Sequence, residues 1–98
     1  MNSIVTRRTL QAFWEKHPDC EVHLKVWYED AMQATWASPN EVKAQFPKAS
    51  ILKDGRIVFN IKGNEYRLVV WVNYRRQWIY VRFIGTHAEY DKIDANTI

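Results

Sequence analysis

Hydrophobic residues in the first half of the chain recur at helical spacing. Leu10, Phe13 and Trp14 follow the i, i+3, i+4 pattern of an amphipathic helix, which we expect to end near His17. Asp19 begins a second helix across a short turn that contains a proline, so the pattern predicts an antiparallel helical hairpin. The apolar stripe of the second helix consists of Leu24, Trp27, Tyr28, Ala31 and Thr35.

Two shorter elements flank this hairpin. Residues 3–5 form a short run that is compatible with a strand ahead of the first helix. Residues 38–41 have the sequence Ser-Pro-Asn-Glu, which is a capping box with proline at the first helical position. They predict a third, short helix that carries Val42 and Phe46 and stops at Pro47.

The second half of the chain alternates between apolar and polar positions, as strands do. Three runs near 56–62, 65–74 and 78–85 predict an antiparallel meander, and residues 63–64, Gly-Asn, fit a two-residue hairpin turn. This turn sets the pairing of the first two strands, so that Asn60 lies opposite Arg67. The same register pairs Lys62 with Glu65, Ile61 with Tyr66, Phe59 with Leu68 and Ile57 with Val70.

One face of this meander is apolar, and the other mixes cations with aromatic rings. A one-residue slip in the pairing of the third strand would expose its apolar side chains to water. We therefore expect the register that turns these side chains inward. The apolar face then holds Ile57, Phe59, Ile61, Leu68, Val70, Val72, Ile79, Val81 and Phe83. The opposite face holds Arg56, Asn60, Lys62, Arg67, Trp71, Asn73, Trp78, Tyr80 and Arg82.

These elements predict an α+β fold. We expect an antiparallel sheet, made of the three-stranded C-terminal meander and a candidate short N-terminal strand, packed against the helical hairpin. With 98 residues and 11.7 kDa, the chain has room for one domain, 1–98. It has a single cysteine, Cys20, no signal-peptide pattern, and no apolar run near the roughly 18 residues of a membrane span. A cytoplasmic protein that does not enter a membrane is therefore expected.

The net charge of +3 conceals a local basic excess. Residues 51–85 carry seven basic and two acidic side chains, whereas residues 1–50 carry six of each. With the aromatic rings of the same strands, this excess predicts a platform for single-stranded nucleic acid, on which cations neutralise phosphates and rings stack on bases. Two structural explanations stay open: a merely solvated sheet face, or a face partly covered by helices or by a small indole cluster. The predicted RNA-binding residues are Arg56, Lys62, Trp71, Arg75, Arg76, Tyr80 and Arg82.

Residues 86–91, Thr-His-Ala-Glu-Tyr-Asp, follow the last strand and would lie beside the edge of this platform. Thr86 and Glu89 fit a capping box, which leaves His87 and Tyr90 unexplained, and a histidine can transfer protons near neutral pH. The sequence lacks metal-ligand spacing, a nucleophile elbow and a glycine-rich phosphate loop, so we expect no metal and no cofactor. This leaves metal-free cleavage of a phosphodiester by the 2′-hydroxyl of RNA as the favoured chemistry.

Two motifs in the second half are specific enough to suggest a family. Residues 58–69 read Val-Phe-Asn-Ile-Lys-Gly-Asn-Glu-Tyr-Arg-Leu-Val, and residues 80–91 read Tyr-Val-Arg-Phe-Ile-Gly-Thr-His-Ala-Glu-Tyr-Asp. With the helical hairpin and the prolines at 39 and 47, they resemble the HigB-type toxins of bacterial toxin-antitoxin pairs, members of the RelE superfamily of mRNA interferases. The resemblance implies a RelE-like fold, cleavage of messenger RNA in the ribosomal A site, and neutralisation by a HigA antitoxin with a helix-turn-helix domain.

The resemblance also implies catalytic roles for individual residues. Arg67 matches the superfamily arginine that stabilises the transition state. His87 falls where relatives have a basic catalytic side chain, and Tyr90 matches a C-terminal aromatic residue that stacks on or protonates the substrate. Asn60 stands where RelE-like enzymes have lysines, so the chain departs from lysine-based proton transfer and Lys62 keeps a phosphate-binding role.

Three other functions stay open at this point. A ParE-like relative would poison DNA gyrase through a protein contact. A non-catalytic RNA-binding module would have the same platform without cleaving RNA. A degenerate toxin would bind its antitoxin and do no harm to the cell.

Overall fold

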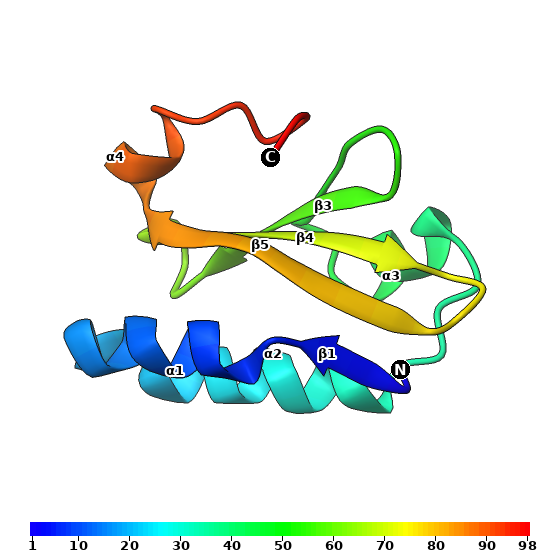
Figure 1. The fold of residues 1–98 in the computed structure, drawn as a ribbon, viewed down its shortest axis with the longest axis horizontal. Helices are drawn as coiled ribbons and strands as arrows, with labels where there is room; N and C mark the ends of the chain where they lie inside the picture. Colours follow the sequence, from blue (N-terminus) through cyan, green and yellow to red (C-terminus); the bar gives the residue numbers. More distant parts are fainter.

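A computed structural model describes residues 1–98 as a five-stranded sheet with a helical hairpin packed on one of its faces (Figure 1). The strand order is β1-β5-β4-β3-β2, in which β1 runs parallel to β5 and all other neighbours are antiparallel. The strands are β1 (Ser3–Val5), β2 (Ser50–Ile51), β3 (Arg56–Ile61), β4 (Tyr66–Asn73) and β5 (Trp78–Thr86). The helices are α1 (Arg7–Lys16), the 3-10 turn η1 (Pro18–Cys20), α2 (Glu21–Gln33), α3 (Pro39–Gln45) and α4 (His87–Tyr90).

This arrangement confirms the predicted α+β fold, in which a helical hairpin packs on a C-terminal meander. The strand expected at residues 3–5 forms and extends the sheet beyond β5. The short strand β2 was not predicted, because two residues show no alternation. The second helix begins at Glu21 after η1 and ends at Gln33, so Thr35 lies outside it and is exposed, contrary to the predicted stripe.

The third helix forms as predicted, but its cap differs from the expected one. Pro39 is its first residue, and the side chain of Ser38 makes no capping hydrogen bond. The carboxylate of Glu41 instead accepts a hydrogen bond from the backbone N–H of Ala37 at 3.1 Å. The chain then returns through a short loop to β2, at the outer edge of β3.

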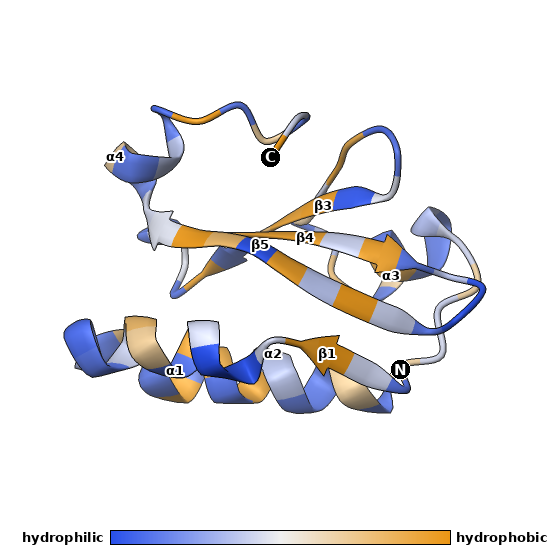
Figure 2. Cartoon of the chain, viewed as in Figure 1, coloured by the Kyte–Doolittle hydropathy of each residue, from blue (hydrophilic) through white to orange (hydrophobic).

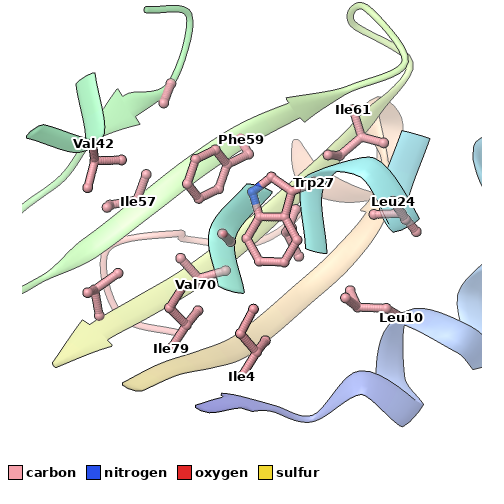
Figure 3. Close-up of a cluster of buried hydrophobic side chains, with 14 of the residues drawn as sticks. Ile4, Leu10, Leu24, Trp27, Val42, Ile57, Phe59, Ile61, Val70 and Ile79 are labelled. Carbon is pink, nitrogen blue, oxygen red and sulfur yellow. The ribbon is translucent and has the colours of Figure 1, made fainter. Parts of the chain in front are cut away.

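The main hydrophobic core lies on the face of the sheet that α1 and α2 cover, which we call the helix face (Figure 3). The ring centroid of Phe59 lies 5.3 Å from that of Trp27 and 5.0 Å from that of Phe46. Phe59 is 2% exposed, and burial of a ring of this size stabilises a fold by about 1.5–3 kcal/mol. Of the residues predicted for the apolar face, those fully buried here are Ile57, Phe59, Ile61, Leu68, Val70, Val72 and Ile79.

A β-bulge reverses the alternation of side chains halfway along β5. The pairing of β4 with β5 shifts by one residue between Val69 and Val70, which leaves Arg82 as the extra residue. The prediction that Phe83 faces the helices is therefore wrong. Phe83 lies on the opposite face of the sheet, and Ile84 packs against the main core instead.

A second, smaller core forms on this opposite face, which we call the open face. Val58 and Val69 are buried there under Ala95. The chain after α4 runs back across the sheet, on the side away from α1 and α2 (Figure 1). The middle of the predicted polar face is thus apolar and covered. The partly buried side chains around this core are Leu52, Phe83, Tyr90, Ile93 and Ile98.

A polar cluster ties the β3–β4 hairpin to the turn between α1 and α2. The carboxylate of Asp19 accepts hydrogen bonds from Lys62 Nζ at 2.9 Å and from the Tyr66 hydroxyl at 2.8 Å. These two donors hold the pKa of Asp19 below its ordinary value of 3.8. The bond to Asp19 raises the pKa of Tyr66 to about 12. Lys62 has a φ of 53°, so it leaves the alternation of β3, and its predicted place on the open face is wrong.

The lowered pKa of Asp19 predicts an acid-sensitive stability. The pKa of Asp19 is lower in the folded protein than in the unfolded chain. Ionised Asp19 therefore stabilises the fold fully at pH values above the unfolded pKa, and this stabilisation disappears as pH falls through the folded pKa. We expect Asp19→Asn to lower the melting temperature at neutral pH and to flatten its decline between about pH 5 and pH 2. Thermal melts across this range test the expectation, with Asp30→Asn on the exposed face of α2 as control. Parallel profiles for Asp19→Asn and the parent protein would contradict it.

Candidate active site on the open face

Arg67 and Asn60 form a cross-strand pair at the hairpin end of the open face. The register places them opposite each other on β4 and β3, as predicted. Arg67 donates a hydrogen bond from Nη1 to Oδ1 of Asn60 at 2.5 Å. Because a guanidinium group only donates, this contact also sets which end of the Asn60 amide points to Arg67. Two neighbouring strands therefore hold one cation in a defined position.

Tyr90 on α4 packs against the same guanidinium group. The Tyr90 ring centroid lies 5.5 Å from Arg67 Cζ, which is within range of a cation–π interaction. The single turn of α4 is fixed by the predicted capping box. In this box, the Glu89 N–H donates to Thr86 Oγ1 at 3.1 Å, and the Thr86 N–H donates to Glu89 Oε1 at 2.8 Å. The capping box therefore determines where Tyr90 lies.

Arg67 retains donor capacity that the protein does not use. Its Nε is buried and has no hydrogen-bond partner. A buried donor without an acceptor is unfavourable by about 1–3 kcal/mol, and by more when the group is charged. The guanidinium has five N–H donors in all, and a cation held in a defined position by Asn60 and Tyr90 is suited to stabilise negative charge that develops during a reaction.

Gly85 allows α4 to lie close to the sheet. It is the cross-strand partner of Arg67 on β5. A Cβ atom at this position would lie 2.5 Å from Cζ of Phe83 and 3.1 Å from Oε1 of Glu89. The sequence assigned Gly85 only to the end of the last strand. The close approach of Gly85 to Phe83 could not be predicted, because the bulge decides which face of the sheet Phe83 lies on.

His87 begins α4 but makes a different contact from Tyr90. Its Nδ1 lies 3.2 Å from Oδ2 of Asp91, and its side chain is 46% exposed. The predicted group of Arg67, His87 and Tyr90 is thus assembled in part: Tyr90 contacts Arg67, whereas His87 contacts Asp91. When the Nδ1–H faces the carboxylate of Asp91, Nε2 is the ring nitrogen left to accept a proton.

The predicted phosphate-binding arginines Arg56 and Arg82 both face the C-terminal segment. Arg56 donates from Nε to the carbonyl oxygen of Ile98 at 3.0 Å, and Arg82 donates from Nε to the same oxygen at 3.5 Å. Each of these guanidinium groups has further N–H donors beyond the one used here. Both arginines therefore lie on the open face, beside the chain that covers the second core.

Three aromatic side chains form a row on the open face, at the end of the sheet away from α4. The ring centroids of Trp71 and Tyr80 are 5.1 Å apart, and those of Trp78 and Tyr80 are 5.9 Å apart. All three rings are half-buried. Gly55 has a φ of 80°, and a Cβ there would lie 3.0 Å from Trp71 Nε1, so the indole depends on this glycine for its place. The aromatic side chains predicted for this face thus lie together at one end of it.

The remaining predicted RNA-binding residues are spread over the molecule. Arg75 and Arg76 are exposed in the β4–β5 turn, which is a hydrophilic tip of the sheet (Figure 2). The strand from Arg67 to Asn73 spans about 20 Å, so this tip is far from the catalytic candidates. Lys62 lies on the helix side with Asp19. The cations thus form separate groups and not one continuous patch.

The C-terminal cover of the open face was missed from the sequence. The signal for it is the spacing of Ile93, Ala95 and Ile98, which are apolar in an otherwise polar segment.

Elsewhere, burial raises the pKa of the Cys20 thiol to about 11. No group of three or more His, Cys, Asp or Glu side chains is placed so that it could hold a metal ion. None of the helices is long and apolar enough to cross a membrane.

Known proteins are similar to this chain in sequence. The model of the HigB toxin family, described as the RelE-like toxic component of a toxin-antitoxin system, matches residues 20–93. This match identifies the chain as a RelE-like toxin. The chain belongs to the HigB toxin family. It is 33% identical over 90 residues to the mRNA interferase toxin HigB of Escherichia coli (strain K12), covering 90% of this chain and 86% of that protein. The mRNA interferase HigB of Escherichia coli O6:H1 is 25% identical over 92 residues, covering 92% and 89% of the two chains.

The close contact at Gly85 predicts a local defect when a side chain is added there. Gly85→Ala should displace α4, because the new methyl group would meet Phe83 and Glu89. We expect a lower melting temperature and altered amide chemical shifts for residues 86–90, with loss of the contact between Tyr90 and Arg67. Asn64→Ala in the exposed hairpin turn is the control. An unchanged NMR spectrum around α4 would contradict this account.

Proposed function

We propose that this toxin is a ribosome-dependent endoribonuclease that cleaves messenger RNA without a metal or cofactor. The observation that carries the proposal is Arg67, whose guanidinium is held between Asn60 and Tyr90. The relative from Escherichia coli strain K12, named an mRNA interferase, supports this class of reaction. In this proposal residues 1–98 act as one domain, in the cytoplasm, where ribosomes and messenger RNA are found.

The reaction uses the 2′-hydroxyl of the RNA as nucleophile. Its oxygen attacks the adjacent phosphorus, the bond to the 5′-oxygen breaks, and a 2′,3′-cyclic phosphate and a 5′-hydroxyl result. Arg67 stabilises the negative charge that accumulates on the phosphate oxygens in the transition state. Asn60 and Tyr90 keep the guanidinium in place before the substrate arrives, so little reorganisation is needed during the reaction.

Proton transfer falls to His87 in this scheme. Nε2 of His87 takes the proton of the 2′-hydroxyl, and water supplies the proton that the leaving 5′-oxygen needs. Asp91 supports this role because its carboxylate lies 3.2 Å from Nδ1 and favours the tautomer whose Nε2 is free. Tyr90 positions Arg67 through its ring.

Binding of the RNA and the ribosome uses the dispersed cations and rings. Trp71 and Tyr80 stack on unpaired bases, whereas Arg56 and Arg82 bind phosphates near the sheet. Lys62, paired with Asp19 on the helix side, takes no part in this scheme. Arg75 and Arg76, at the distal turn, contact ribosomal RNA. The protein partner is an antitoxin of the toxin-antitoxin pair, for which we propose a HigA-like helix-turn-helix protein.

Removal of Arg67 tests the catalytic proposal directly. Arg67→Ala should reduce ribosome-dependent cleavage by about 100-fold to 1,000-fold, because it removes the donor to the developing charge. His87→Ala should cost about 100-fold or more through the loss of general base catalysis. The measurement is 5′-end mapping of transcripts after brief induction, with Arg8→Ala on the exposed side of α1 as control. Folded Arg67→Ala that cuts at the parent rate would refute the proposal, and inhibition of purified gyrase by the parent would favour a ParE-like activity.

A pair of Tyr90 variants separates the ring from the hydroxyl. Tyr90→Phe keeps the ring beside Arg67, so we expect cleavage within about threefold of the parent, since a cation–π contact uses the ring face. Tyr90→Ala removes that contact and should lose activity while remaining folded in a thermal melt. Equal loss in both variants would show that the hydroxyl, and not the ring, is what the reaction requires.

A further inference from the structure

The outer edge of β3 is uncovered where β2 ends. β2 pairs only with Ile57 and Val58, and continuation of the same register would place Lys48 opposite Asn60. The chain at residues 46–49 is instead a loop, which leaves two hollows along this edge. Lys48 and Asn60 line both hollows. One hollow, of about 300 Å³, is also lined by Gln45, Phe46, Pro47, Ala49 and Phe59, and the other, of about 460 Å³, by Gly63 and Asn64.

Two amide side chains that line these hollows accept a hydrogen bond through their oxygen, which leaves their NH2 group as a donor. Asn60 Oδ1 already accepts from Arg67, so its Nδ2 group remains to donate. Gln45 Oε1 accepts from Trp36 Nε1 at 2.9 Å, so its Nε2 group also remains to donate. Lys48 adds an ammonium group, and no carboxylate lines either hollow. This set fits a ligand that is anionic and rich in hydrogen-bond acceptors.

The backbone of β3 adds to this character. The Leu52 N–H donates to the Arg56 carbonyl at 2.9 Å, so the peptide groups of Arg56 face β2. In an antiparallel ladder this direction repeats every second residue, which turns the peptide groups of Asn60 outward beyond the end of β2. The edge thus offers a backbone donor and acceptor beside the Asn60 side chain.

The floor of the smaller hollow is apolar. Phe46 is half-buried, and its ring stands edge-to-face with that of Phe59 at an interplanar angle of 77°. An aromatic wall beside donors and a cation is the combination by which proteins bind a nucleotide of a single strand, with the base on the ring and the phosphate on the cation. A volume of about 300 Å³ is sufficient for one nucleotide, at the lower end of the range for ligand pockets.

We propose that these hollows form a subsite for one nucleotide of the substrate RNA, next to the nucleotide at Arg67. The base packs on Phe46, Lys48 binds the phosphate, and Asn60 joins the subsite to the catalytic arginine through its two amide ends. This inference rests on the proposed function, because it takes the strand at Arg67 to be the RNA substrate.

The test measures binding of a fluorescent, fully 2′-O-methylated single-stranded oligonucleotide, which lacks the nucleophile and is not cleaved. Affinity is measured at several salt concentrations, and its logarithm is plotted against the logarithm of the salt concentration. The slope of this plot should become shallower by about 0.7 in Lys48→Gln, because one phosphate contact disappears. Lys53→Gln, an exposed lysine in the β2–β3 turn, is the matched control and should keep the parent slope. Phe46→Leu, checked for folding by thermal melting, should weaken binding by about fivefold or more through lost stacking.

Cleavage of messenger RNA on ribosomes, measured with the same proteins, separates the two proposals. If the parent cleaves but Lys48→Gln and Phe46→Leu bind like the parent, the subsite is refuted and the endoribonuclease stands. If binding depends on Lys48 and Phe46 but the parent does not cleave, the subsite stands and the catalytic proposal fails. An oligonucleotide that does not bind the parent protein would also overturn the subsite.

Discussion

One extra residue in β5 sets the geometry of the whole open face. Without the bulge at Arg82, Phe83 would point into the main core, and Val58 and Val69 would lose an aromatic neighbour on their side of the sheet. With the bulge, Phe83 joins them, and the three side chains form a surface on which the segment after α4 packs. The contact between Tyr90 and Arg67 follows from this packing, because Tyr90 belongs to the same second core.

The helix face supplies the rigidity that the site needs. Arg67 and Asn60 project from strands whose other side carries the buried residues Leu68 and Phe59. A shift of the β3–β4 register by one residue would move every one of these side chains to the wrong face, so the core and the arginine–asparagine pair are specified together. Asp19 adds a polar restraint at the hairpin end, where the turn would otherwise be free to fray.

Local patterns were enough to predict the helical hairpin, the third helix, the β3–β4 register, the capping box of α4 and every strand except β2. They also placed Asn60 opposite Arg67, because a short turn leaves little choice of pairing. They failed where one residue departs from its local period. Lys62 leaves the strand through a positive φ, and Phe83 changes face through the bulge, and neither change alters the hydrophobic pattern. The cover by the C-terminal segment depends on the face that Phe83 takes, so the sequence could only suggest its participants, whereas the contact of His87 with Asp91 joins residues four apart and is local.

The structure also resolves the question that the basic segment raised, whether the open face is a platform or only a solvated surface. Its middle is neither, since Val58 and Val69 are buried under the chain after α4. Its two ends remain accessible: one holds the half-buried row of Trp71, Trp78 and Tyr80, and the other holds Arg67. The two ends differ in chemistry, with half-buried rings at one and a guanidinium that has several N–H donors at the other. The division of the face into a covered centre and two accessible ends follows from the bulge, because Phe83 completes the apolar centre on which the chain after α4 packs.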